Sequence, residues 1–153
     1  MKNINYILLI LLFTFVTSCI STKGFIKNID DNAATPILKD DNSFVIKNKS
    51  SNPNYGFNKD YPINIFYANT LNDTINQMRF LNALAGPKGE ELIYSKEESC
   101  CPFPTNRSNV GAGFLDVYKI TWSKNTKPIL LYFNIYEKGI LEIPVGLTSK
   151  KRD

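Results

Sequence analysis

The chain has 153 residues, a formal net charge of +4 at pH 7, and 43% hydrophobic and 21% charged residues. This balance is typical of one globular domain and unlike that of a disordered chain. Histidine is absent, which excludes histidine-based triads, histidine-ligated metal sites and the commonest acid/base residue. The positive charge is weak and scattered, so nucleic acid is not an expected partner.

The N-terminus has the pattern of a secretory signal. Lys2 precedes an apolar run over residues 6–16, which is shorter than the roughly 20 residues that a spanning helix needs. Val16-Thr17-Ser18-Cys19 then resembles the lipobox of bacterial lipoproteins. That resemblance implies cleavage before Cys19 and acylation of this cysteine with a diacylglycerol and usually a third chain, such as palmitate. An ordinary signal peptide with an accidental cysteine is the alternative.

We therefore predict a signal peptide over residues 1–18 and a lipid anchor at Cys19, which holds the mature chain to a membrane. Residues 20–42 show no sustained hydrophobic period, so residues 19–42 are predicted as a tether. No acidic run follows Cys19. Some Gram-negative bacteria use such a run to send lipoproteins outward, so its absence favours the periplasmic face of the outer membrane.

A single α+β domain is predicted over residues 43–150. A first strand is expected at residues 43–47, and a second at residues 62–67, where apolar and polar residues alternate. A helix follows, with Thr70 or Asn72 as its N-cap and Gly86-Pro87 as its stop signal. Its predicted apolar stripe consists of Leu71, Ile75, Met78, Leu81 and Ala85.

The second half of the chain is predicted to be strand-rich. Strands are expected at residues 91–95, 114–123, 128–137 and 140–147, the last three as a meander. One main helix on a mostly antiparallel sheet of about five or six strands is an α+β fold.

The segment "ESCCPFP", residues 98–104, contains two adjacent cysteines. In an oxidising compartment they could form a vicinal disulfide, structural or redox-switchable. They could also remain unpaired thiols, or serve as a catalytic thiol or metal ligand. Ordinary disulfides join Cα atoms roughly 4.4–6.8 Å apart, whereas neighbours lie about 3.8 Å apart. Pro102 also favours an extended Cys101, so we expect Cys100 and Cys101 to be held apart, with one buried.

Three polar residues could accompany the cysteines in a pocket. Asn82 lies within the predicted apolar stripe of the helix, Arg79 borders it, and Arg107 lies in the loop after the cysteines. A buried amide needs partners, so Asn82 is either a structural hydrogen-bonding residue or part of a site. No cofactor and no metal are expected.

Four motifs together resemble a family of small lipoproteins of Gram-negative bacteria. They are "RFLNALAGPKGE" (79–90), "SCCPF" (99–103), "GFLDVYKITW" (113–122) and "PVGL" (144–147). Many members carry the label 2-dehydro-3-deoxyphosphooctonate aldolase. That aldolase is a TIM barrel, which needs about 250 residues and eight βα units, so the label is physically disfavoured here.

Two functional hypotheses follow. The first is a lipid-anchored envelope protein, more a binding or structural module than an enzyme, whose partner is an unknown envelope protein or small molecule. The second is a thiol-dependent or redox activity centred on Cys100 and Cys101.

Overall fold

The computed structural model describes residues 26–40, 42–67, 73–125 and 127–151. The predicted signal peptide and Cys19 lie outside the described residues. So do Thr70, Leu71 and Asn72, and with them the predicted helix cap.

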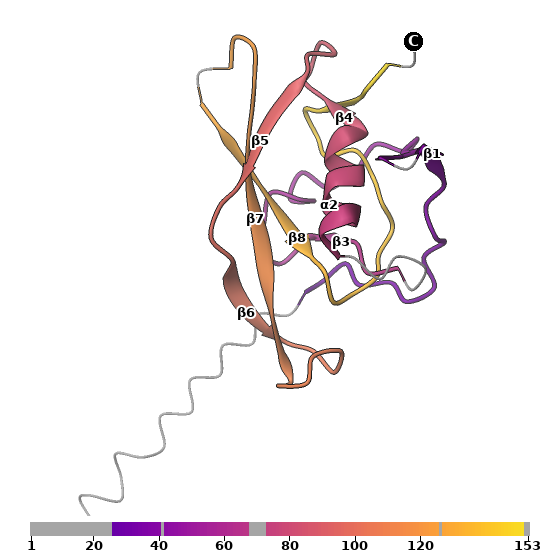
Figure 1. The fold of residues 1–153 in the computed structure, drawn as a ribbon, viewed down its shortest axis with the longest axis vertical. Coiled ribbons are helices and arrows are strands. Elements are labelled where there is room, and N and C mark those ends of the chain that lie inside the picture. Colours follow the sequence, from indigo (N-terminus) through magenta and orange to yellow (C-terminus); the bar gives the residue numbers. More distant parts are fainter. Residues whose placement is uncertain (1–25, 41, 68–72, 126, 152–153) are drawn as a thin grey trace, which may run out of the picture.

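The main sheet has five strands in the order β3-β8-β7-β5, with β6 also paired to β7 (Figure 1). The longest strand is β7, and β5 and β6 pair with successive parts of one of its edges while β8 pairs with the other. All of these pairs are antiparallel except β3 with β8, which is parallel. The bounds are β3 (Ile63–Asn64), β5 (Leu92–Lys96), β6 (Cys100–Pro104), β7 (Ala112–Trp122) and β8 (Ile129–Asn134).

Helix α2 (Asp73–Asn82) lies on one face of this sheet, and two small sheets lie beside it (Figure 1). One small sheet pairs β1 (Leu38–Asp40) with β2 (Ser43–Phe44), and the other pairs β4 (Leu84–Ala85) with β9 (Thr148–Ser149). The predicted α+β class, with one main helix on a mostly antiparallel sheet, is confirmed.

The core lies between α2 and the main sheet. Phe133 on β8 contacts Phe80 of the helix and Tyr118 of β7 edge to face, with ring centroids 5.7 and 5.3 Å apart. Such arrangements stabilise aromatic pairs beyond their burial alone. The largest apolar side chains packed around them include Ile63, Leu81, Ile120 and Leu131.

The predicted helix stripe is wrong at Ile75 and at its C-terminal end. Ile75 is 42% exposed, whereas Asn76 and Gln77 are buried beside Phe80 and Leu81. The helix ends at Asn82, so Ala85 belongs to β4 instead. The hydrophobic pattern did not identify the buried face of the helix. The side-chain amides of Asn76 and Gln77 can be buried because hydrogen bonds in the core offset the cost of burying them.

The predicted third strand of the meander is also wrong. Residues 140–147 form no strand, although Ile143 makes an isolated parallel bridge with Lys49. Pro144 has no N–H to donate and Gly146 has a φ of +87°, so this stretch cannot continue a ladder. The free edge of β8 is taken by β3.

The expectation of a tether over residues 19–42 does not hold for the part that the structure describes. The Lys27 and Asp30 amides donate to the carbonyls of Asp60 and Lys138, both at 2.8 Å, and Ala33 is buried. Residues 26–40 therefore belong to the folded domain. No helix among the described residues is long and apolar enough to cross a membrane.

Candidate functional site

The cysteine segment forms β6, in which Cys100 lies opposite Leu115 of β7. Cys100 and Cys101 are joined by a disulfide bond, and both residues are half-buried. The prediction that they are held apart, with one buried, is therefore wrong.

The backbone of Cys101 explains the error. Its φ is +59°, in the left-handed region, and the register of β6 against β7 shifts between Cys100 and Phe103. The prediction assumed an extended Cys101, which would send neighbouring side chains to opposite faces. A left-handed residue at a bulge breaks that alternation, and both sulfurs come to the same side.

Beside the disulfide lies a buried carboxylate, Asp116 of β7. It is 7% exposed and accepts hydrogen bonds from Ser99 (2.7 Å), Gln77 (2.6 Å) and Lys96 (2.8 Å). The Tyr118 hydroxyl donates to the other end of the Gln77 amide at 2.7 Å. Asp116 thus joins α2, the end of β5 and the start of the cysteine segment.

Two opposing effects set the pKa of Asp116. Burial disfavours its charged form, but the hydrogen bonds from Lys96, Ser99 and Gln77 outweigh it and lower the pKa below its ordinary value. Burial, with Asp116 as a second cause, raises the pKa of Tyr118. The carboxylate is thus charged and engaged by three donors, as a structural group would be.

The predicted polar companions lie elsewhere. Asn82 donates to the carbonyl of Asn42 (2.9 Å) and accepts from the Tyr94 hydroxyl (2.8 Å), which favours its structural interpretation. The Arg79 guanidinium contacts the Asn76 side chain at 3.4 Å. The structure does not bring these two residues into hydrogen-bonding contact with the cysteines.

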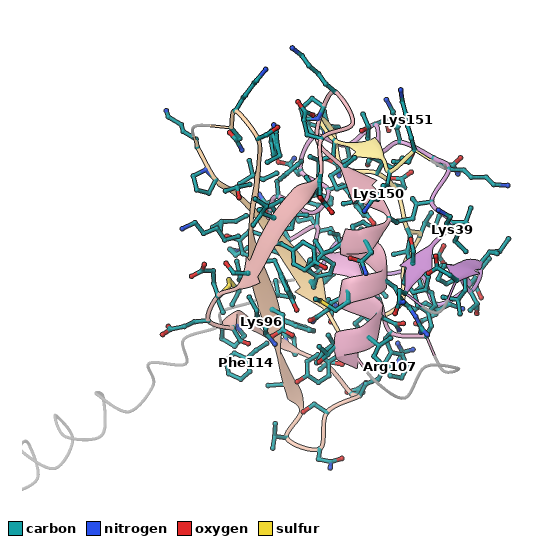
Figure 2. The ribbon with its side chains drawn as sticks, turned by 45° about the horizontal axis from the view of Figure 1, so that its top comes forward. Lys39, Lys96, Arg107, Phe114, Lys150 and Lys151 are labelled. Carbon is teal, nitrogen blue, oxygen red and sulfur yellow. A yellow bond between two sulfur atoms is a disulfide. The ribbon has the colours of Figure 1, made fainter. Side chains whose placement is uncertain are left out.

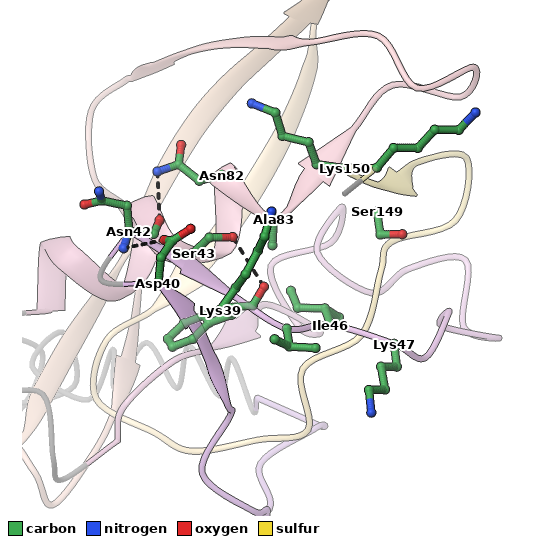
Figure 3. A pocket seen from close by; sticks show the side chains of 13 residues that line it. Lys39, Asp40, Asn42, Ser43, Ile46, Lys47, Asn82, Ala83, Ser149 and Lys150 are labelled. Carbon is green, nitrogen blue, oxygen red and sulfur yellow. Dashed lines mark hydrogen bonds between the residues drawn. The ribbon is translucent and has the colours of Figure 1, made fainter. Parts of the chain in front are cut away.

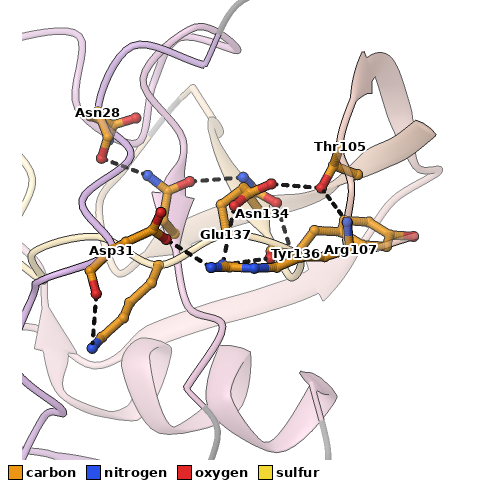
Figure 4. A network of polar contacts seen from close by, with 9 residues as sticks. Asn28, Asp31, Thr105, Arg107, Asn134, Tyr136 and Glu137 are labelled. Atoms are coloured by element: carbon orange, nitrogen blue, oxygen red, sulfur yellow. Dashed lines mark hydrogen bonds and ion pairs between the residues drawn. The ribbon is translucent and has the colours of Figure 1, made fainter. Parts of the chain in front are cut away.

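Arg107 is the centre of a separate polar network (Figure 4). It pairs with Asp31 at 2.8 Å and with Glu137 at 3.1 Å, and its guanidinium lies 5.1 Å from the centroid of the Phe66 ring. The Thr105 hydroxyl donates to Glu137 at 2.6 Å. Arg107 thus connects the N-terminal segment, residues 26–40, and its own loop to the segment that follows β8.

A hollow of about 660 Å³ opens between the two small sheets (Figure 3). Its buried residues are apolar, namely Phe44, Ile46 and Ala83, and Asn82 also lines it. Four lysines surround it: Lys39, Lys47, Lys150 and Lys151. Figure 2 shows three of these on one side of the molecule, with Lys96 and Phe114 on the other.

Sequence reasoning missed both Asp116 and this hollow. The lysines of the hollow come from opposite ends of the domain, and no local motif links them. Asp116 did carry a signal, because an acid within the apolar strand "FLDVYKITW" needs a partner if it is buried.

The described residues contain no group of three or more histidine, cysteine or acidic side chains that could hold a metal ion. Comparisons of the chain with protein-family models, with curated proteins and with solved structures found no match.

Proposed function

We propose that this chain is a lipid-anchored protein of the cell envelope whose domain is a non-catalytic binding module. The observation that carries the proposal is the open hollow, with an apolar floor and a lysine rim. Binding sites are usually concave, and roughly 300–1,000 Å³ is their common size. The sequence before Cys19 supports the anchor, and the absence of an acidic run after Cys19 favours the periplasmic face of the outer membrane.

Metabolic labelling with palmitate in a Gram-negative host tests the anchor. Label is expected on the wild type and on the Cys100→Ser/Cys101→Ser control, and not on Cys19→Ala. Intact mass of the membrane-extracted protein would then show the acyl chains. Label that persists in Cys19→Ala would overturn the anchor.

Photo-cross-linking in cells tests the binding module. Benzoylphenylalanine is placed at Ser149, an exposed residue of the hollow, and at the matched exposed position Ser123, directly after β7. A discrete adduct is expected from position 149 alone. If both positions give the same adducts, or neither gives any, the hollow is not a binding site.

A second candidate function is thiol–disulfide exchange at Cys100 and Cys101. The observation in its favour is a disulfide that is half-buried, and so within reach of a partner, at a left-handed residue. A thiolate of a partner dithiol would attack one sulfur, and its second thiol would resolve the mixed disulfide. The cysteines leave as two thiols and the partner as a disulfide, with two electrons and two protons transferred.

The Cys100→Ser/Cys101→Ser variant separates these functions. If it melts at a lower temperature but preserves the cellular phenotype, the exchange function is rejected and the bridge is structural. Loss of the phenotype with unchanged melting would instead reject a purely structural bridge.

The aldolase label gains no support from the fold. The described residues form an open, mostly antiparallel sheet with one helix, whereas a TIM barrel alternates eight parallel strands with eight helices.

A further inference from the structure

We propose that the hollow accepts an extended, acidic segment of a partner protein, which adds as a β-strand between β2 and β9. This inference rests on the proposed binding function and deepens it by naming the class of partner. Four observations carry it: two sheet edges, the volume of the hollow, its apolar floor and its lysine rim.

The first edge belongs to the β1–β2 sheet. The Val45 amide donates to the Ile37 carbonyl at 2.8 Å, which shows that Val45 faces β1. Backbone groups of successive residues point to opposite edges of a strand, so those of Phe44, the last residue of β2, point away from β1, where its carbonyl accepts from the Ser43 hydroxyl at 3.4 Å. Phe44 lines the hollow.

The second edge belongs to the β4–β9 sheet. The Lys150 amide donates to the Ala83 carbonyl at 2.9 Å, so Lys150 faces β4. By the same alternation, the backbone groups of Ser149, the last residue of β9, point away from β4, and Ser149 lines the hollow. The hollow is therefore bordered by one edge from each small sheet.

A strand placed between these edges would join two two-stranded sheets into one five-stranded sheet. Strand addition of this kind draws affinity from main-chain hydrogen bonds and specificity from pockets for alternate side chains. The volume of about 660 Å³ leaves room for a short extended segment. Phospholipid headgroups carry negative charge as well, but they offer no peptide backbone to a sheet edge.

The chemistry of the walls defines the side chains of the segment. Phe44, Ile46 and Ala83 form an apolar floor, which suits β-branched side chains on one face of the added strand. On the rim, four lysines stand against one described acid, Asp40. Lys150 also pairs with Glu91 outside the hollow at 3.7 Å, whereas Lys39 forms no ion pair with a described residue. Acidic residues on the other face of the segment would complement this rim.

The probe is a fluorescein-labelled octapeptide of alternating Val and Glu, titrated by anisotropy into the full chain in detergent at low salt. We expect saturable binding by the wild type and a loss of affinity of about tenfold or more in Lys39→Glu/Lys150→Glu. The matched control is Lys119→Glu/Lys127→Glu, which makes the same charge change at exposed positions outside the hollow and is expected to bind like the wild type.

A second peptide, N-methylated at alternate residues, keeps every charge but cannot donate along one edge. It is expected to lose binding, and only the unmethylated peptide should slow hydrogen exchange at Phe44 and Ser149. Equal binding of the two peptides, equal loss in both lysine pairs, or no binding to the wild type would each overturn strand addition. An adduct from position 149 in cells, with no peptide binding, would reject this inference and leave the binding module standing.

Discussion

Asp116 is the residue on which several elements of the domain converge. Its carboxylate accepts from Ser99, Gln77 and Lys96 while only 7% of the residue is exposed. Hydrogen bonds to a charged group contribute more to stability than neutral ones, and a buried donor left without its acceptor is costly. The stability of the cysteine segment should therefore depend on this one side chain.

Asp116→Asn tests that dependence at neutral pH. The new amide group would face at least one of the three donors, so the free energy of unfolding is expected to fall by about 1–3 kcal/mol. Urea titration followed by circular dichroism measures the change, with Glu98→Gln as an exposed control on the same segment. An unchanged midpoint in Asp116→Asn would show that the hydrogen bonds contribute nothing net.

The pH dependence gives a second readout. Because folding lowers the pKa of Asp116, its contribution to stability is present above the ordinary value of 3.8 and is lost as pH falls through the folded value. From about pH 4 downward, the wild type should therefore lose more stability than Asp116→Asn does. Parallel losses in the two proteins would contradict a lowered pKa.

Cys101 offers a test of backbone conformation without the bridge. A left-handed residue with a Cβ carries a conformational cost that glycine avoids. If the bulge itself imposes this conformation, Cys100→Ser/Cys101→Gly should be more stable than Cys100→Ser/Cys101→Ser by up to about 1 kcal/mol. Thermal unfolding compares the two, and a more stable serine variant would mean that the bridge alone holds Cys101 left-handed.

At the scale of elements, α2 is the clearest case of an unexpected buried face. Gln77 is fully buried and bridges Asp116 and the Tyr118 hydroxyl, and Asn76 donates to the Ile65 carbonyl at 3.0 Å. The helix thus binds the sheet through polar contacts as well as through Phe80 and Leu81.

Two substitutions on α2 distinguish the observed buried face of the helix from the predicted one. Gln77→Leu keeps the volume but leaves the Tyr118 hydroxyl without its acceptor and removes one of the three donors to Asp116, so it should lower the free energy of unfolding by about 1–3 kcal/mol. Ile75→Gln lies on the exposed side and should change it by less than about 0.5 kcal/mol. Chemical denaturation measures both, and the reverse order would restore the predicted stripe.

The elements that could be read from the sequence are those with a strong local signal. Strands β5, β7 and β8 and the helix all carry a periodic or β-branched pattern, and each was predicted close to its observed place. Pairing partners carry no such signal. The parallel pair of β3 with β8 joins residues about 70 positions apart. The sequence instead favoured residues 140–147 as the partner of β8, because segments that follow each other in the chain usually pair.

The candidate site was predictable only in part, for the same reason. The cysteine pair stands out in the sequence. Its disulfide bond, however, depends on the left-handed conformation of Cys101, which no local sequence pattern predicts. The hollow is lined by Lys39, Ala83 and Lys150, which lie far apart in the sequence and are brought together only by the tertiary fold.

At the scale of the whole molecule, two side-chain networks add to the backbone hydrogen bonds that hold the N-terminal segment, residues 26–40, to the domain (Figure 4). Within the core, Asn134 donates to Asn64 at 2.9 Å, and Asn64 donates to the Asn28 carbonyl at 2.8 Å. Nearer the surface, Arg107 pairs with Asp31. In a lipid-anchored protein, this attachment would limit how far the domain can move away from the membrane.

Arg107→Ala should loosen that attachment without unfolding the domain. The Asp30 amide, which donates to Lys138, should exchange its hydrogen faster, because the ion pair with Asp31 beside it is lost. Amides of β7 should exchange as in the wild type, since the core asparagines remain.

Lys119→Ala removes an exposed cation outside the network and serves as the control. Native-state hydrogen exchange followed by mass spectrometry measures all three proteins. Equal acceleration across β7 would mean that Arg107 stabilises the whole domain, and no acceleration at Asp30 would mean that the Arg107–Asp31 ion pair does not help to hold the segment.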